Sequence, residues 1–301
     1  MSRSLVVAVI LCAALAACSK KKPKPDETAP PPTATRDGGA MTVDEALAKL
    51  TAICNGGDFE ACRNLGVIFA EGKGVKPDPL RALGYYQKAC DGGNAAGCNN
   101  LGLATMRGLG APANPVAARS QFERGCTAGS LLACRNLGMA RSRGEGGPRD
   151  DAGALAVFRK TCEDGLALAC TNAGTMYAAA DTTVRDPAAA LAWYQKGCEG
   201  GDSGGCRQLG AAYLTGSGVK AGPAPAAVWF GKGCSLGDGP SCRFLGELTL
   251  EGKGVPKDEA KAAALRSRAC QLGDRAACPA APAAPTAGTG GGAPAPTAGT
   301  P

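Results

Sequence analysis

Apolar residues recur along most of the chain with the spacing of one face of an α-helix. In one stretch, this apolar face consists of Ala61, Cys62, Leu65, Ile68 and Phe69. Asp58 stands where it can cap the start of the helix, and Gly72-Lys73-Gly74 stands where the helix should stop. The pattern predicts an amphipathic helix between Asp58 and Gly72, which we call helix A.

A second helix follows, and its start is marked by a capping residue and a proline. Asp78 precedes Pro79, and the helical pattern then continues to Cys90, which predicts a helix B over this range. The same capping position recurs at Asn114, Asp150, Asp186, Gly222 and Asp258. One turn inside helix B, an alanine small enough for close helix approach recurs at Ala46, Ala82, Ala118, Ala154, Ala190, Ala226 and Ala262. Four residues later an aromatic ring recurs at Tyr86, Phe122, Phe158, Tyr194 and Phe230, with Leu50 and Arg266 in this position at the two ends.

Both helices belong to a sequence unit that recurs every 36 residues without insertion or deletion. Its most constant feature is a pair of cysteines eight residues apart: Cys54 and Cys62, Cys90 and Cys98, Cys126 and Cys134, Cys162 and Cys170, Cys198 and Cys206, Cys234 and Cys242, and Cys270 and Cys278. A glycine follows the first cysteine of each pair by three residues. A fixed period of this length indicates a solenoid in which each unit packs on its neighbours. The fold class that we expect is therefore all-α, an α/α solenoid.

The two ends of the array differ from its middle. An isolated helix B opens the array, with Thr42 and Glu45 as a capping box. Asp274 can cap a last helix A, but Pro279 follows soon after, so we expect about one helical turn there. We expect one opening helix, six A/B pairs and a terminal stub. The fourth unit lacks the Gly-x-Gly stop, which predicts an irregular loop near residues 180–182.

The domain organisation follows from shifts in composition. Residues 1–17 read as a signal peptide with a short apolar segment, because this segment is too short for a spanning helix. Residues 18–42 form a Pro- and Lys-rich tether, 43–278 the solenoid, and 279–301 a tail of Ala, Pro, Gly and Thr that cannot bury a core. Leu15-Ala16-Ala17-Cys18 resembles the lipobox of bacterial lipoproteins, which implies lipidation of Cys18. The alternative is a plain secretory signal that leaves Cys18 as an odd thiol.

Charge and composition exclude several functions. The formal net charge of +7 includes four lysines of the tether, so the repeats are only mildly basic and nucleic acid is not an expected partner. The chain has no histidine, which removes the usual general base and the commonest metal ligand. We therefore expect no catalytic residue, no metal and no cofactor.

The unit resembles a known family. The pattern Ala-Cys-x-Asn-Leu-Gly, Gly-x-Gly-Val, Asp-Pro and Tyr-Tyr-Gln-Lys-Ala-Cys, between Ala61 and Cys90, is similar to the Sel1-like repeat, a TPR-like unit. The version with paired cysteines resembles the Helicobacter cysteine-rich proteins. This resemblance implies a secreted right-handed superhelix of antiparallel helix pairs whose concave surface binds partners. It also implies penicillin binding or weak β-lactam hydrolysis as a second possible function.

Disulfides are the expected state of the fourteen cysteines in the repeats, because paired cysteines in a secreted chain indicate an oxidising compartment. The short glycine-containing loop favours pairing within each eight-residue spacing, from the end of helix B to the start of the next helix A. Pairing of Cys62 with Cys90 across one hairpin is geometrically conceivable. Zinc binding is the other alternative, but its tetrahedral sites prefer closer cysteine spacing.

A ladder of polar residues follows the second cysteine of the pairs, beside the inward-packing leucine. Its members are Arg63, Asn64, Asn99, Asn100, Arg135, Asn136, Asn172, Arg207 and Gln208. One hypothesis is that these donors bind a partner's backbone or carboxylates. The alternative is that the asparagines bond between units and the arginines are solvated. A basic residue two before each helix-B cysteine complements the helix dipole, at Lys88, Arg124, Lys160, Lys196, Lys232 and Arg268.

One short motif points to catalysis. Ser217 and Lys220 match the Ser-x-x-Lys of penicillin-binding enzymes, but they fall in a Gly-rich loop and not at a preorganised helix start. The leading hypothesis is a non-enzymatic lipoprotein, anchored in the bacterial outer membrane and facing the periplasm or the cell surface. Its solenoid would bind a protein or peptide of the envelope. Penicillin binding and a purely structural spacer are the alternatives.

Overall fold

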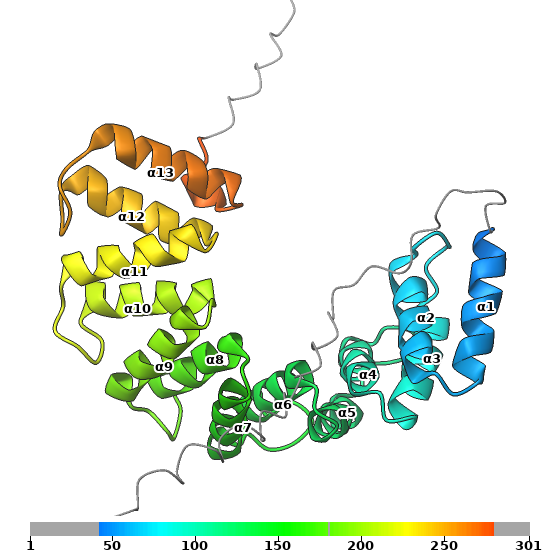
Figure 1. The fold of residues 1–301 in the computed structure, drawn as a ribbon. Coiled ribbons are helices and arrows are strands. Elements are labelled where there is room, and N and C mark those ends of the chain that lie inside the picture. Colours follow the sequence, from blue (N-terminus) through cyan, green and yellow to red (C-terminus); the bar gives the residue numbers. More distant parts are fainter. Residues whose placement is uncertain (1–41, 180, 280–301) are drawn as a thin grey trace, which may run out of the picture. The chain divides into compact units, whose positions relative to one another are not determined.

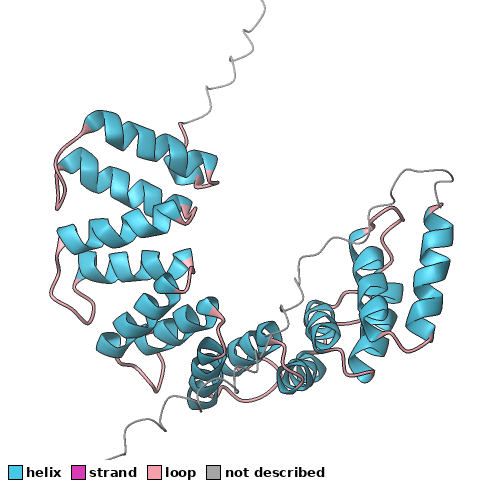
Figure 2. Cartoon of the chain, in the orientation of Figure 1, coloured by secondary structure: helices cyan, strands magenta, loops and turns pink. Residues whose placement is uncertain are grey.

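The computed structural model describes residues 42–179 and 181–279, and all regular structure in these ranges is helical (Figures 1 and 2). The predicted signal peptide, Cys18, most of the tether and nearly all of the tail lie outside the described residues. No helix in the described ranges is long and apolar enough to span a membrane. The helices are α1 (Val43–Asn55), α2 (Phe59–Glu71), α3 (Pro79–Asp91), α4 (Ala95–Arg107), α5 (Pro115–Thr127), α6 (Leu131–Arg143), α7 (Asp151–Glu163), α8 (Ala167–Ala178), α9 (Pro187–Glu199), α10 (Ser203–Thr215), α11 (Pro223–Ser235), α12 (Gly239–Glu251), α13 (Glu259–Gln271) and the 3₁₀ turn η1 (Arg275–Ala277).

The predicted solenoid is confirmed. Helix α1 opens the array, the even-numbered helices α2 to α12 are the A helices, and the odd-numbered helices α3 to α13 are the B helices. Each helix packs on the helices before and after it in the chain (Figure 1). The single turn η1 takes the place of a seventh helix A, with Asp274 as its cap.

The capping residues explain why the helices begin and end in register. The Asp58 side chain accepts a hydrogen bond from the Ala61 amide, and Asp78 accepts one from the Arg81 amide ahead of a proline in the first turn. Helix α2 ends at Gly72, whose φ of 70° is the left-handed conformation that glycine adopts without strain. The B-helix cap Gly222 is the exception, because it has no side chain to accept a bond.

In four of the six helix pairs the core holds a leucine from helix A and an aromatic ring from helix B; Ala173 replaces the leucine in the fourth pair and Arg266 the ring in the last. Leu101 and Phe122 are both buried, and the ring lies against Gly102. A Cβ at Gly102 would lie 2.5 Å from Phe122 Cε1. The Leu-Gly pair therefore has two separate tasks, since the leucine fills the core and the glycine leaves room for the ring.

The second glycine of each Gly-x-Gly loop packs on the preceding unit. Gly110 has a φ of 81°, and a Cβ there would lie 2.4 Å from the carbonyl oxygen of Pro79. Gly146 stands in the same way against Pro115. This close approach places each loop on the first turn of the previous helix B, so the motif joins units as well as ending a helix.

Seven disulfides connect the units along the chain, and each joins two cysteines eight residues apart. The end of α1 or of a helix B is bonded to the start of the following helix A, or in the last unit to the residue after η1. Cys90 of α3, for example, lies 4.4 Å from Cys98 of α4 between Cα atoms, and Gly93 in the turn between them has a positive φ. The alternative pairing of Cys62 with Cys90 does not occur. The bonds are Cys54 to Cys62, Cys90 to Cys98, Cys126 to Cys134, Cys162 to Cys170, Cys198 to Cys206, Cys234 to Cys242 and Cys270 to Cys278.

The fourth unit departs from the pattern, as predicted. Helix α8 ends one residue earlier than its equivalents, at Ala178, without a left-handed glycine. Thr182 stands where the other units have the second loop glycine, and Asp151, the first residue of α7, stands where α3, α5, α9 and α11 have a proline. The Thr183 amide donates to Asp151 Oδ2 at 2.9 Å, so a hydrogen bond joins these two segments in place of the glycine contact.

Candidate functional site

The candidate ligand-binding residues lie on the A helices, at the two positions after the second cysteine of each pair. Helix α2 contacts α4 and α4 contacts α6, while α8 contacts α10 and α10 contacts α12, so the A helices form rows in which these positions recur. Contact between α6 and α8 is weaker. We call the surface formed by the two positions the A-row face.

In the second half of the solenoid, the first position of the A-row face bonds to the capping residue of the next helix A. Arg207 of α10, next to the bonded Cys206, forms an ion pair with Asp238, the cap of α12. Arg243 of α12, next to the bonded Cys242, forms one with Asp274, the cap of η1, through Nε at 2.8 Å. Thr171 of α8, next to the bonded Cys170, donates to Asp202, the cap of α10. These polar side chains therefore join units, while one edge of Arg207 stays exposed to solvent.

In the first half, the same positions are joined through other partners. Arg63 donates to Glu60 on its own helix, and Asn94, the cap of α4, donates to the second Glu60 oxygen at 2.9 Å. Burial raises the pKa of Glu60, but the hydrogen bonds from Arg63 and Asn94 outweigh it and lower the pKa below its ordinary value. One unit further, Asn136 Nδ2 donates to Asn99 Oδ1 at 2.8 Å. The expectation that asparagines bond between units thus describes this pair.

The bonds that join successive A helices elsewhere are missing between α6 and α8. The cap of α8 is Leu166, which has no side-chain acceptor, so Arg135 of α6 faces no capping carboxylate. Arg135 Nε is buried without a hydrogen-bond partner, and so is Asn172 Nδ2 of α8. Burial lowers the pKa of Arg135, the nearby charge of Arg143 lowers it further, and Asp202 opposes both.

Three predicted residues carry polar groups that are not tied to a neighbouring unit. Asn100 accepts only a long bond of 3.5 Å, from Asn99 on the same helix. Asn64 accepts from Arg63, its neighbour in sequence. Gln208 of α10 is half-buried. The structure thus divides the predicted ladder into residues that join units and residues whose amides form no described bond to a neighbouring unit.

The basic residues near the helix-B cysteines do more than complement their own helix dipole. Arg124 Nη2 donates to the carbonyl oxygen of Cys90 and to Asp91, both on the preceding helix B. Arg268 donates to the carbonyl of Cys234 in the same way. These arginines satisfy carbonyl groups at the end of the preceding helix B, a role that the sequence pattern does not reveal.

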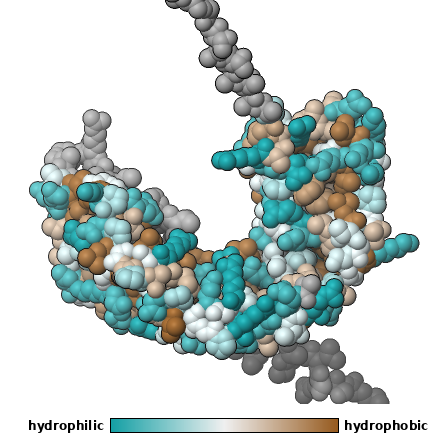
Figure 3. Space-filling model, turned by 180° about the vertical axis from the view of Figure 1, so that it is seen from behind, coloured by the Kyte–Doolittle hydropathy of each residue, from teal (hydrophilic) through white to brown (hydrophobic). Residues whose placement is uncertain are grey.

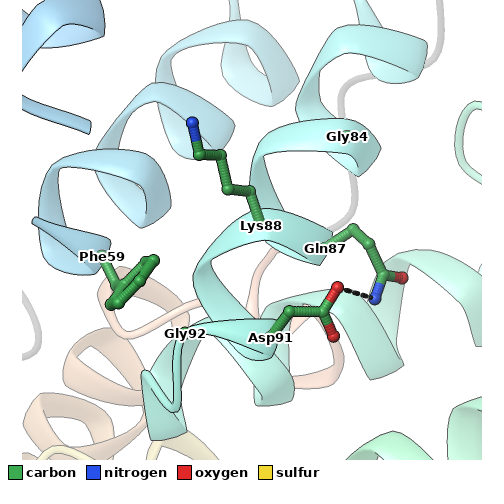
Figure 4. Close-up of a pocket in the computed structure, with 6 residues that line it drawn as sticks. All are labelled: Phe59, Gly84, Gln87, Lys88, Asp91 and Gly92. Atoms are coloured by element: carbon green, nitrogen blue, oxygen red, sulfur yellow. Dashed lines mark hydrogen bonds between the residues drawn. The ribbon is translucent and has the colours of Figure 1, made fainter. Parts of the chain in front are cut away.

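A pocket of about 490 Å³ lies between α2 and α3, lined by Phe59, Gly84, Gln87, Lys88, Asp91 and Gly92 (Figure 4). Its Gln87 amide donates to Asp91 at 2.8 Å. The ring of Phe59 lies against Gly92, where a Cβ would be 2.1 Å from it. Since the pocket lies open to solvent and holds one internally bonded acid–amide pair, we assign it no chemistry.

The catalytic and metal-binding alternatives gain no support from the geometry. Ser217 and Lys220 are exposed in the loop between α10 and α11, and the Ser217 amide only completes the end of α10. Within residues 42–179 and 181–279, no group of three or more His, Cys, Asp or Glu side chains is placed to hold a metal ion. The fourteen repeat cysteines are bonded in pairs.

The surface mixes polar and apolar residues. On the face shown in Figure 3, hydrophobic residues lie among hydrophilic ones. Exposed aliphatic residues such as Leu80, Val116 and Val228 stand on three different B helices. Scattered residues of this kind are normal on a protein surface.

The stacked helix pairs define an α/α repeat protein, and comparison with known families gives a more specific assignment. The sequence model of the Sel1 repeat matches six consecutive segments, residues 59–94, 95–130, 131–166, 167–202, 203–238 and 239–274. These segments make up most of the chain, which therefore belongs to the Sel1 repeat family. In this division of the chain, five of the seven disulfides join one repeat to the next, and the first and last join a repeat to Cys54 or Cys278 outside the matched segments.

The chain is similar to several solved structures, and two of them superpose with TM-scores above 0.6. The c5321 protective antigen of uropathogenic Escherichia coli superposes with a TM-score of 0.67 at 28% identity, over 77% of this chain and 50% of the antigen. This chain thus matches half the length of the antigen. A Sel1 repeat protein of Oxalobacter formigenes gives a TM-score of 0.63 at 23% identity, over 75% of this chain and 92% of that protein. Cysteine-rich protein B of Helicobacter pylori is 31% identical over 43% of this chain and 93% of its own length, with a TM-score of 0.37. No curated protein sequence matches the chain.

Proposed function

We propose that this chain is a non-enzymatic envelope protein whose solenoid binds a protein or peptide partner along the A-row face. The observation that carries the proposal is that polar side chains recur on this face and are held by bonds between units, such as Asn136 to Asn99 and Arg207 to Asp238. A surface fixed in this way loses little conformational entropy when a ligand binds. An extended peptide could contact several units, and each hydrogen bond would contribute roughly 0.5–1.5 kcal/mol.

The compartment supports a role in the envelope. Seven disulfides indicate an oxidising, extracytoplasmic compartment. The resemblance of residues 15–18 to a lipobox supports lipidation of Cys18 and anchoring in the outer membrane, facing the periplasm or the cell surface. The description of the similar E. coli protein as a protective antigen is in keeping with this location.

The anchor can be tested directly. Growth with a labelled fatty acid should mark the mature protein, and the Cys18→Ala variant should be unlabelled and released from membranes. Wild-type protein that carries no label and is freely soluble would contradict the anchor, and it would leave the binding proposal standing.

Partner binding is tested by capture from the native envelope after crosslinking. The test variant replaces Asn100, Asn172 and Gln208 together by Ala. These three residues belong to the A-row face, and no described hydrogen bond joins their side chains to a neighbouring unit. A matched control variant replaces the exposed B-helix residues Leu80, Val116 and Val228 by Ala.

We expect the A-row variant to lose the captured protein and the B-helix variant to retain it. Both variants should keep the helical circular dichroism and the disulfides of the wild type. Equal capture by all three proteins, or capture of nothing by the wild type, would refute the proposed function.

A further inference from the structure

Four arginines occupy the first position of the A-row face, and three of them have a carboxylate partner. Arg63 pairs with Glu60, Arg207 with Asp238 and Arg243 with Asp274. Arg135 is the exception. Its one hydrogen bond is a long contact of 3.4 Å from Nη1 to the amide oxygen of its neighbour Asn136, and its buried Nε has no acceptor.

The sequence explains why this arginine has no partner. In two later units, the acceptor for this position is the capping aspartate of the next helix A, Asp238 for Arg207 and Asp274 for Arg243. For Arg135 the corresponding cap is Leu166, which also leaves the start of α8 without a side-chain cap. An aliphatic residue thus stands where a carboxylate would otherwise stand.

A second unpaired donor belongs to the same junction. One unit earlier, Asn136 Nδ2 donates to Asn99 Oδ1 at 2.8 Å. The equivalent pair at the α6–α8 junction is Asn172 and Arg135, and an arginine offers no acceptor. Asn172 Nδ2 is accordingly buried without a partner. The acceptor oxygen that Asn99 offers to Asn136 thus has no counterpart at Arg135 for the amide nitrogen of Asn172.

Unpaired buried donors are costly, so native proteins rarely keep them without another partner. The charges around this junction are Arg143 on α6, which adds positive potential, and Asp202, which opposes it. Asp202 is already bonded to the Thr171 hydroxyl and to the Gly205 amide. Arg135 and Asn172 are both half-buried, while Arg135 Nε and Asn172 Nδ2 themselves are covered, so a ligand would approach through the exposed parts of the two side chains.

We propose that the α6–α8 junction is a binding site for a carboxylate of the partner, held by the guanidinium of Arg135 and the amide of Asn172. The inference rests on the proposed function and names the group that the A-row face recognises. A carboxylate suits the site because it brings negative charge and two acceptor oxygens, which fit a planar guanidinium and a neighbouring amide donor. It would take the place that Asp238 and Asp274 hold for the other arginines.

The site can be tested without knowing the partner, by NMR of the arginine Nε–H and asparagine side-chain signals in the intact oxidised protein. Acetate is the probe, and acetamide is its neutral control. We expect acetate to produce a saturable shift of the Arg135 Nε–H and Asn172 Nδ2 signals. The Nε–H signal of Arg243, whose carboxylate partner is internal, should stay in place.

The Leu166→Asp variant provides a matched control, because it puts an aspartate where Asp202 and Asp238 stand in other units. Its internal carboxylate should shift the Arg135 signal in the absence of acetate and abolish the response to acetate. The Arg135→Gln variant keeps Leu166 and should remove the acetate-dependent shift of Asn172. The proposal fails if acetate causes no saturable shift in the wild type, if acetamide acts equally, or if Leu166→Asp responds as the wild type does.

Two sources could supply the carboxylate, a chain terminus or an acidic side chain, and short peptides separate them. Acetyl-Ala-Ala-Ala with a free carboxyl terminus represents the first, and acetyl-Ala-Glu-Ala-amide represents the second. Acetyl-Ala-Gln-Ala-amide is the uncharged control. The peptide with the preferred carboxylate should bind roughly ten- to a hundredfold more weakly to Arg135→Gln than to the wild type. If neither acidic peptide binds better than the glutamine peptide, the site does not recognise a peptide carboxylate.

The outcomes also separate this site from the proposed function. A wild type that responds to acetate but captures no envelope protein would retain the site and refute partner binding. A wild type that captures a partner, without an acetate response and with equal capture by Arg135→Gln, would refute the site and retain partner binding.

Discussion

Gly102 is in close contact with Phe122, so adding one methyl group at position 102 tests how tightly the two helices of a unit pack. In the Gly102→Ala variant the added Cβ would lie 2.5 Å from Phe122 Cε1 and 2.6 Å from Cδ1. Phe122 is 2% exposed, so its ring has little room to move away. Overpacking of this kind typically costs about 1–3 kcal/mol.

The same substitution at Gly84 is a matched control. Gly84 lies within α3 and is exposed, and a Cβ added there would have no neighbouring atom within 4 Å. Alanine is preferred over glycine inside a helix by about 1 kcal/mol, so Gly84→Ala should stabilise the protein. Both substitutions carry this helix preference, and the difference between the two variants therefore isolates the packing cost of about 1–3 kcal/mol at Gly102.

Thermal unfolding of the oxidised proteins, followed by far-ultraviolet circular dichroism, measures the difference. One kcal/mol corresponds to about 2–4 °C in Tm for a domain of this size, so Gly102→Ala should unfold at least a few degrees below Gly84→Ala. Equal Tm values for the two variants would refute the interpretation that the glycine of the Leu-Gly pair is needed to leave space for the aromatic ring.

Three further predictions concern the disulfides, the irregular fourth unit and the catalytic alternative. Replacing Cys126 and Cys134 together by Ser should cost about 2.5 kcal/mol, by the chain-entropy argument for a loop of this size, whereas the same change at Cys270 and Cys278 should affect only η1 at the end of the array. Denaturant titration would show this difference, and equal destabilisation by the two pairs would contradict it. Hydrogen bonds from Arg149, together with those from Thr183, hold the pKa of Asp151 below its ordinary value of 3.8. The stability that this carboxylate contributes is therefore fully present above pH 3.8 and is lost as the pH falls through the lower folded pKa. The Tm of Asp151→Asn should lie below that of the wild type at about pH 6 and converge with it in stronger acid, and a constant difference would be inconsistent with this assignment. Purified mature protein should not hydrolyse nitrocefin, and turnover that the Ser217→Ala variant abolishes would favour the β-lactam-hydrolysing alternative.

Sequence periodicity predicted most of the fold because one unit is repeated almost without change. The caps Asp58 and Asp78, the loop glycines and the cysteine spacing each recur in fixed register, so one unit defines its neighbours. The departure of the fourth unit was also visible, since Ala178 to Thr182 lacks the glycines that end other A helices.

The residues that join units were harder to predict. A periodic pattern shows where a residue lies on its helix, but it does not show which residue of the next unit that side chain contacts. The bond from Arg124 to the Cys90 carbonyl depends on the spacing between successive B helices, which the sequence does not state. Ala46 shares its position with alanines that are buried in the later B helices but is itself exposed, because within the described residues no helix A precedes α1.

The two unpaired donors at the α6–α8 junction were not predicted, for a different reason. Leu166 is the one aliphatic residue among the caps of the A helices, and this signal was present in the sequence. Its consequence for Arg135 and Asn172 became visible only when the structure placed each first-position side chain against the next cap.

The claim that the A-row face binds a partner is tested most directly by a photo-reactive amino acid placed at single positions and irradiated in intact cells. Asn100 of α4 lies on the A-row face, and Leu80 of α3, 67% exposed, lies on a helix B. The account predicts that the probe at position 100 forms a covalent adduct with an envelope protein and that the probe at position 80 does not. Adducts at position 80 alone, or equal adducts at both positions, would contradict it.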